Sequence, residues 1–166
     1  AKTVQVSLVD DAQFEPDELF QVRLSNPVGA TLGTPSTADV VLQDDDPSNF
    51  VCTPGPSELC LNGSRFRVRA FWSTSQGTSG EGQAQPLTGD TGTFWFFESD
   101  NVEVVVKVLD ACSPFGSFWV FAAGLTDVQV TLEVTDSLTG RSNRYENPQS
   151  TPFRPLQDTA AFACIP

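Results

Sequence analysis

The chain has 166 residues, of which 39% are hydrophobic, so it can build a packed core in one large or two small domains. Twenty-one acidic residues against nine basic ones, with no histidine, give a net charge of -12 at pH 7. Because binding to phosphate groups needs a basic surface, this charge speaks against a nucleic-acid-binding protein and favours cations as partners.

The first region shows the two-residue alternation that is typical of half-buried β-strands. Three strands are predicted, and the apolar residues that share one face of each are Val4, Val6 and Leu8, then Phe20, Val22 and Leu24, then Ala38, Val40 and Leu42. The stretch NPVGATLGTPST between the second and third strands is rich in Gly, Pro, Ser and Thr and predicts a crossing loop.

The composition changes after Asp46, where three prolines within residues 47–57 predict a short, stiff linker. We therefore expect a first domain at residues 1–46 and a second at 58–166. The second contains six segments of strand-like alternation, at 65–72, 93–99, 102–109, 117–125, 128–136 and 141–147. Their spacing is typical of a β-sandwich. Residues 73–92 are expected to form a long polar loop. No window sustains a helical period, so the predicted class is all-β.

All four cysteines, Cys52, Cys60, Cys112 and Cys164, lie after residue 50. Their even number predicts two disulfides and an oxidising compartment. Four free thiols or a zinc site of four thiolates are the alternatives, and the absence of a C-x2-C pair speaks against zinc. Of the three possible pairings we favour Cys52 with Cys60, because the intervening Thr-Pro-Gly-Pro can double the chain back. That choice leaves Cys112 for Cys164.

Aromatic residues are concentrated in the second region. Alternation places Phe94 and Phe96 on one face of a strand and Trp95 and Phe97 on the other, so one pair must belong to the core. We favour packing as the role of these aromatic residues. A subunit interface, or a row of rings that stacks on sugars, are the alternatives.

Three arginines, at positions 65, 67 and 69, alternate with apolar residues along one strand. They predict either a solvated strand face or a ladder of ion pairs with an acidic neighbour, which is the strand carrying Glu103 or another subunit. Asn62 begins an Asn-Gly-Ser sequon for glycosylation, but Asn-Gly also marks a tight turn, and we favour the turn.

The acidic residues of the first region form a recognisable pattern. VSLVDDAQFEPDELFQVRLSNPVGATLG followed by ADVVLQDDD combines Asp-Asp, Glu-x-x-Glu, Leu-Ser-Asn-Pro and Asp-Asp-Asp in one order. With these motifs, residues 3–46 resemble the C-terminal half of a Calx-beta domain, an immunoglobulin-like calcium module. The resemblance implies a partial immunoglobulin-like sandwich that holds Ca2+ at one tip. The residues that match the ligands are Asp10, Asp11, Glu15, Glu18, Asp44, Asp45 and Asp46.

A physical argument supports the same site. Ca2+ takes six to eight oxygen ligands, so its site needs several carboxylates from different loops. Asp10 and Asp11 end one predicted strand, and 44–46 end another. If both strands end at the same pole, repulsion among these carboxylates costs several kcal/mol unless a cation neutralises them. The alternative is a solvated acidic rim, or Asp residues used only as turn formers.

A half domain has open strand edges and an uncovered apolar face, which invite pairing with another chain. The missing strands can come from an upstream part of the same precursor, from the second domain, or from a neighbouring subunit. Donation by neighbours is head-to-tail and gives filaments. With no Met and no apolar run of membrane-spanning length, the chain is expected to be a processed or partial piece without a membrane span.

Residues 52–164 resemble an uncharacterised all-β module found near the ends of secreted bacterial proteins, through LCLNGSRFRV, FWFF, NVEVVVKVLDAC and FWVFAAGLTDVQVTLEVTD. Without His there is no Ser-His or Cys-His pair, so we expect no enzyme activity. The prediction is a secreted bacterial structural or adhesive β-protein of the cell surface, a calcium-stabilised homo-oligomer or filament subunit. The alternative is a carbohydrate-binding accessory module of a larger secreted hydrolase.

Overall fold

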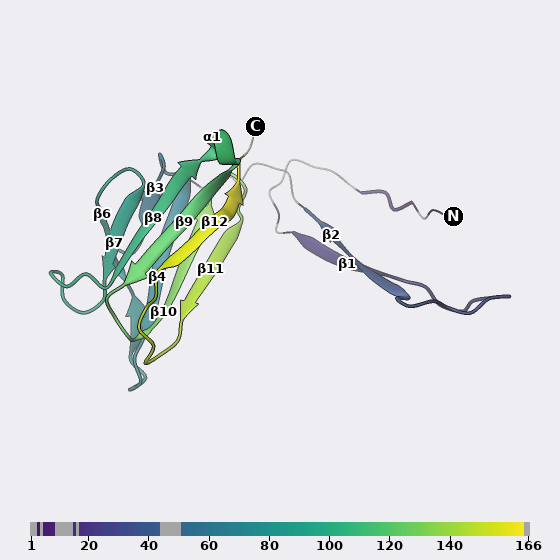
Figure 1. Cartoon of the computed structure of the whole chain (residues 1–166), viewed down its shortest axis with the longest axis horizontal. Coiled ribbons are helices and arrows are strands. Elements are labelled where there is room, and N and C mark those ends of the chain that lie inside the picture. Colours follow the sequence, from purple (N-terminus) through teal and green to yellow (C-terminus); the bar gives the residue numbers. More distant parts are fainter. Residues whose placement is uncertain (1–2, 4, 9–14, 16, 44–50, 165–166) are drawn as a thin grey trace. The chain divides into compact units, whose positions relative to one another are not determined.

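The computed structural model describes residues 3, 5–8, 15, 17–43 and 51–164. The chain divides into two compact units, Ala1–Pro47 and Ser48–Pro166 (Figure 1). The fold is all-β, as the alternation predicts, and the described residues contain a single short helical turn, α1 (Cys112–Phe115). Within the described ranges, no helix is long and apolar enough to cross a membrane.

The first unit contains an antiparallel hairpin made of β1 (Glu18–Arg23) and β2 (Thr37–Leu42). Both strands lie where the alternation predicts them. Phe20 is opposite Val40, and Val22 is opposite Ala38, so the apolar residues of the two strands share one face. The backbone N–H of Leu24 donates to the carbonyl of Ser36 over 2.8 Å and continues the pairing beyond the strands.

The structure differs from the prediction before the hairpin. A strand was expected around Val4, Val6 and Leu8, but residues 3 and 5–8 lie outside any strand, and Val6 and Leu8 are exposed. Val4 lies outside the described residues. Alternation defines an apolar face, but a strand also needs a neighbour for its backbone hydrogen bonds, and none is provided to these residues within the described part of the unit.

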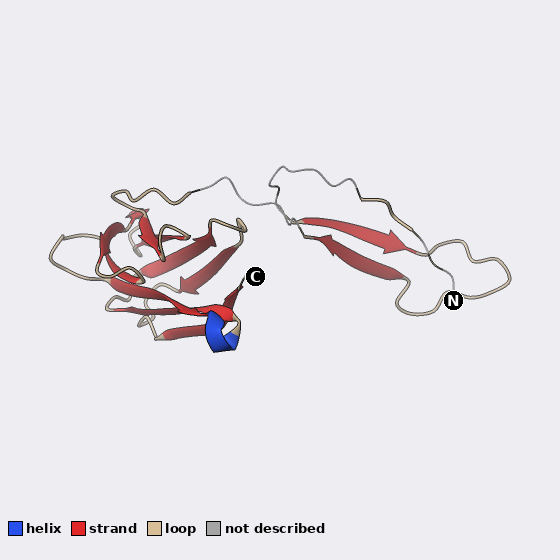
Figure 2. Ribbon diagram, turned by 90° about the horizontal axis from the view of Figure 1, so that it is seen from above, coloured by secondary structure: helices blue, strands red, loops and turns tan. Residues whose placement is uncertain are grey.

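The second unit is a sandwich of two antiparallel sheets, which Figure 2 shows as separate layers of strands. One sheet has the order β11-β10-β4-β3, with β5 also paired to β4, and the other has the order β12-β9-β8-β7-β6. The bounds are β3 Leu59–Leu61, β4 Phe66–Ser73, β5 Ser79–Glu81, β6 Gln83–Pro86, β7 Thr91–Trp95, β8 Val104–Ala111, β9 Ser117–Gly124, β10 Gln129–Asp136, β11 Ser142–Asn147 and β12 Leu156–Ala163.

The core lies between these sheets and consists of every second residue of the central strands. Phe66 of β4 is fully buried, and its ring centroid lies 4.8 Å from that of Phe118 and 5.1 Å from that of Phe162 in the opposite sheet. Phe94 and Phe96 are also buried, whereas Phe97 on the other face is exposed. The inward pair of this aromatic stretch is therefore the one at 94 and 96.

The predicted polar loop at 73–92 is in part regular structure, because β5, β6 and the start of β7 lie within it. These short strands were missed because their small and polar residues carry no apolar period. Gly82 lies between β5 and β6, and a Cβ there would come within 2.9 Å of the Phe96 ring, so the close approach requires glycine. β12 was also missed, since a bulge between Asp158 and Phe162 interrupts its alternation.

The start of the second unit is fixed onto the sandwich. The Ala84 N–H donates to the Pro56 carbonyl over 2.7 Å, and Gly55 pairs with Glu58 in an isolated bridge. The structure contains the disulfides Cys52–Cys60 and Cys112–Cys164, the pairing that we favoured. Cys52 and Pro56 of the expected linker are therefore held against the sandwich.

Two sets of polar contacts lie at the border of the core. Arg65 donates two hydrogen bonds to the buried carboxylate of Asp136, at 3.0 and 2.8 Å, and its guanidinium also lies 4.4 Å from the centroid of the Phe118 ring. Tyr145 of β11 donates to Asp158 of β12 over 2.8 Å. Burial, and after it this hydrogen bond, raise the pKa of Tyr145 well above its usual value, so the phenol stays a donor.

Candidate functional site

The predicted calcium ligands fall largely outside the described residues. Asp10, Asp11 and the acids at 44–46 belong to that undescribed part, whereas Glu15 and Glu18 are described and exposed. Within the described ranges there is no group of three or more His, Cys, Asp or Glu side chains placed to hold a metal ion. The calcium site therefore stays a prediction.

One feature of the hairpin bears on that prediction. Glu18, the first residue of β1, is opposite Leu42, the last residue of β2. The Asp-Asp-Asp motif begins two positions after Leu42 in the sequence. The pairing thus places the backbone of Glu18, a predicted ligand, beside the end of β2. In the sequence, that end is followed by three further predicted ligands, Asp44, Asp45 and Asp46.

The hairpin has no core of its own. All buried hydrophobic residues of the described chain lie between Cys52 and Phe162, and none of the described residues of the first unit is buried. We call Phe20, Val22, Ala38, Val40 and Leu42 the hairpin face; of these, Ala38 is exposed and the other four are half-buried. On the opposite face Leu19 and Val41 are 68% and 56% exposed. An isolated two-stranded hairpin is only marginally stable in water, and the described residues of this unit add no further strand to β1 and β2.

The two outer faces of the sandwich differ in chemistry. The outer face of the sheet that contains β4 carries a ladder of ion pairs, in which Arg67 and Arg69 lie within 4.0 Å of Glu58, and Arg69 also pairs with Glu81. A ladder of ion pairs thus exists on this face, but its acids are Glu58 and Glu81 and not the expected Glu103, which accepts a hydrogen bond from Asn101. Hydrogen bonding by Ser57 and the charge of Arg69 lower the pKa of Glu81. This face is suited to water.

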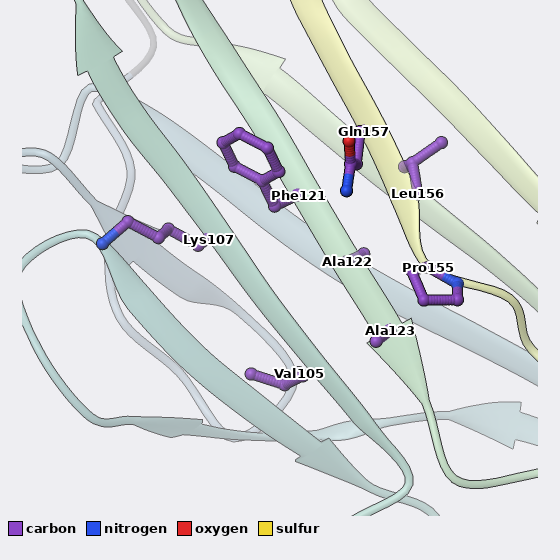
Figure 3. Close-up of a pocket in the computed structure, with 8 residues that line it drawn as sticks. All are labelled: Val105, Lys107, Phe121, Ala122, Ala123, Pro155, Leu156 and Gln157. Carbon is purple, nitrogen blue, oxygen red and sulfur yellow. The ribbon is translucent and has the colours of Figure 1, made fainter.

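The outer face of the other sheet is apolar. A groove of about 210 Å³ runs over β8, β9 and the start of β12, and we call it the outer groove (Figure 3). Its lining residues are Val105, Lys107, Phe121, Ala122, Ala123, Pro155, Leu156 and Gln157. Phe121 stands on the outer face of β9, between Lys107 on β8 and Gln157 on β12 (Figure 3). These residues make the outer groove the apolar part of this face, in contrast to the charged ladder on the other sheet.

Aromatic rings continue from the outer groove along β9. The centroid of the Trp119 ring lies 6.2 Å from that of Phe121 and 4.8 Å from that of Phe115, which is exposed. Sequence reasoning favoured packing for these rings. Both faces of β9 are apolar, so alternation alone does not tell which face lies in the core. In the structure Phe118 and Val120 are buried in the core, and Trp119 and Phe121 lie on the outer face.

Polar groups beside the outer groove are already bonded. Lys107 pairs with Asp90 at 2.7 Å, and Asp90 also accepts hydrogen bonds from the hydroxyls of Thr88 and Thr91. The Lys107 hydrogen bond, followed by those of the two threonines, holds the pKa of Asp90 far below its usual range. The Asp90 carboxylate is therefore ionised at neutral pH and holds three hydrogen-bond partners.

The glycosylation sequon is used structurally. The side-chain amide of Asn62 donates to the Val108 carbonyl over 2.8 Å, and both Asn62 and Gly63 have positive φ, at 52° and 67°. The amide nitrogen that a glycan would modify is thus engaged, and the backbone forms the tight turn that we favoured.

The class that this fold defines is an all-β, disulfide-bonded protein with a small hairpin unit and a β-sandwich unit. Part of the chain is similar to known proteins. It is 42% identical over 53 residues to extracellular matrix protein 3 of Lytechinus variegatus, and 35% identical over 77 residues to the sodium/calcium exchanger Calx of Drosophila melanogaster. These matches cover 30% and 45% of the chain, but only 2% and 8% of the two relatives.

The match to the exchanger is longer than Ala1–Pro47, so at least part of it lies in the second unit. No protein-family model matches the chain, and no solved structure matches it. Neither of these two relatives is bacterial, and the resemblance of the second unit to a bacterial module stays a prediction.

Proposed function

We propose that the protein is a secreted, non-enzymatic structural or adhesive subunit that self-associates through its hairpin unit, whose open edges and apolar face are completed by another copy. The observation that carries this proposal is the hairpin without a buried residue, joined to a sandwich that has a full core. Unpaired backbone groups at both edges of such a ribbon are templates for added strands. Because the contact is head-to-tail, repetition builds a filament.

An extracellular location fits the chemistry of the chain. All four cysteines are paired in two disulfides, which persist in oxidising compartments. The partial similarity to an extracellular matrix protein points the same way.

Calcium is the proposed cofactor of the hairpin unit. The pairing of Glu18 with Leu42 and the partial similarity to a sodium/calcium exchanger support a Calx-beta-like calcium site built on the two strands. Calcium would neutralise the acids at the strand ends and so permit the hairpin to order. Its ligands would be the seven predicted carboxylates.

The carbohydrate-binding alternative is less well supported. A sugar ring stacks on a flat, open aromatic surface, but the rings of Phe115, Trp119 and Phe121 are tilted by 47° and 67° to their neighbours and pack against one another. The Trp119 N–H, which could bind a hydroxyl, already donates to Ser117.

Sedimentation velocity over a range of protein concentrations tests the proposal. The wild type should form species that grow with concentration, and Phe20→Glu, which places a charge on the hairpin face, should sediment as a monomer. The control is Val28→Glu, since Val28 is 98% exposed in the loop of the same unit and should behave as the wild type. A wild-type monomer at all concentrations would contradict self-association.

Calcium binding is tested separately by thermal unfolding. At a hundredfold excess over its dissociation constant, calcium that binds only the folded state adds about 2.7 kcal/mol of stability. The hairpin transition should therefore move to higher temperature with Ca2+ and back with a chelator. Replacing Asp44, Asp45 and Asp46 by Asn should abolish the shift. An unchanged transition in the wild type would leave only a solvated acidic rim.

A further inference from the structure

The hairpin face needs a surface that can cover it. Two sheets pack face to face, about 10 Å apart, when the facing side chains of both are apolar. The sandwich has one outer face of this kind, the outer groove, and one that is a charged ladder. We propose that the outer groove of one copy receives the hairpin face of a second copy. This inference rests on the proposed function, because it names the acceptor surface for the same self-association.

The lengths of the strands are compatible with this contact. β1 and β2 have six residues each, whereas β8 and β9 have eight. The two-stranded ribbon is thus shorter than the strands that would receive it. Phe121 of the outer groove is half-buried and Val105 is exposed, so both have apolar surface left to bury. The hairpin face offers Phe20 and Val40 for the same purpose.

Charges at the two surfaces are complementary. The described hairpin segment 17–43 holds three acids, Asp17, Glu18 and Asp39, against the single base Arg23. Lys107 lines the outer groove, and the exposed Arg154 directly precedes Pro155 at its other side. Because Asp90 compensates Lys107, the positive side chain beside the outer groove that we expect to meet an acidic ribbon is the exposed Arg154. Opposite charges at the rim favour encounter and set orientation more than they add affinity.

A polar ligand is a poorer occupant of the outer groove. Asp90 already accepts three hydrogen bonds, and the Trp119 N–H donates to Ser117, whose hydroxyl donates to the Thr159 carbonyl over 3.0 Å. Hydroxyl groups of a glycan would find few free partners there, and each unpaired group would lose its hydrogen bonds to water. An apolar strand face makes no such demand.

A complementation experiment tests the proposal with the full chain. Phe121→Glu should weaken self-association at least about tenfold, as Phe20→Glu does, because either charge would be buried in the contact. Leu125→Glu is the matched control: Leu125 is 80% exposed just after β9 and does not line the outer groove, so this variant should assemble normally. Unchanged circular dichroism and melting of the sandwich verify the fold of each variant.

Mixing the two variants then tests the geometry. The Phe20→Glu copy keeps an intact outer groove, and the Phe121→Glu copy keeps an intact hairpin face. The 1:1 mixture should therefore form a dimer that grows no further, although each variant alone is a monomer. A self-complementary contact between two identical faces would not give this result.

Each other outcome has a definite meaning. If Phe20→Glu abolishes assembly while Phe121→Glu does not, the groove is overturned as the acceptor and the proposed function stands. If the wild type is a monomer at every concentration, both fail. Two monomeric variants that do not combine overturn the contact between copies. Glycan-array binding by the wild type that is lost in Phe121→Glu, with no self-association, would assign the outer groove to a sugar.

Discussion

The strands of both units alternate apolar and polar residues, but among the described residues the apolar ones are buried in only one of the two units. β1 and β4 both alternate apolar and polar residues, yet Phe66 of β4 is fully buried while Phe20 of β1 is not. The difference is the number of partners: β4 has strands on both sides and a second sheet over its apolar face, whereas among the described strands β1 pairs with β2 alone. Alternation prepares a face for burial, but only a second layer removes it from water.

The largest expected difference between the two units is the effect on stability of removing a phenylalanine ring. Phe66→Ala should lower the free energy of unfolding of the sandwich by about 3 to 5 kcal/mol, because it removes a buried ring that contacts two others. The matched change Phe20→Ala should leave that free energy unchanged within about 0.5 kcal/mol. Denaturant unfolding of the second unit measures both. Similar losses in the two variants would show that the hairpin shares the core of the sandwich.

The two disulfides of the sandwich are expected to differ in how much they stabilise it. The Cys112–Cys164 bond joins residues 52 apart, and Cys52–Cys60 joins residues 8 apart. On the chain-entropy model the longer loop contributes about 4 kcal/mol and the shorter about 2.5 kcal/mol. Replacing both cysteines of each pair by Ala should therefore differ by about 1.5 kcal/mol in unfolding free energy. Hydrogen exchange of β1 and β2 should be the same in both variants, and slower or faster exchange there would couple the units.

The smallest expected effect concerns pH. The pKa of Asp90 is lowered in the folded state, so its pair with Lys107 contributes its full stability above the unfolded pKa of about 3.9 and loses it progressively as the pH falls from that value towards the lower folded pKa. Since both side chains are partly exposed, Asp90→Asn should cost at most about 1 kcal/mol at pH 6. That cost should shrink below about pH 4. A cost that does not change with pH would argue against the ion pair.

Local rules predicted much of the fold. The strands β1, β2, β4 and β8 to β11 coincide with predicted segments to within about two residues, most clearly where apolar and polar residues alternate, as in β4 and β10. Edge elements were missed: β5 and β6 are short and polar, and β12 is interrupted by a bulge. β3 was missed as well, because its three residues, Leu59–Leu61, are too few to show a period although both leucines are buried.

The sequence by itself determined the all-β class, the acidic first region, and the strand segments with a period of two. Only the tertiary structure decided which apolar face of β9 turns inward, which acids pair with the arginines of β4, and that Phe121 is left at the surface. The physical reason is that period and composition are local, whereas burial and ion pairing depend on strand order and register between residues far apart in the chain.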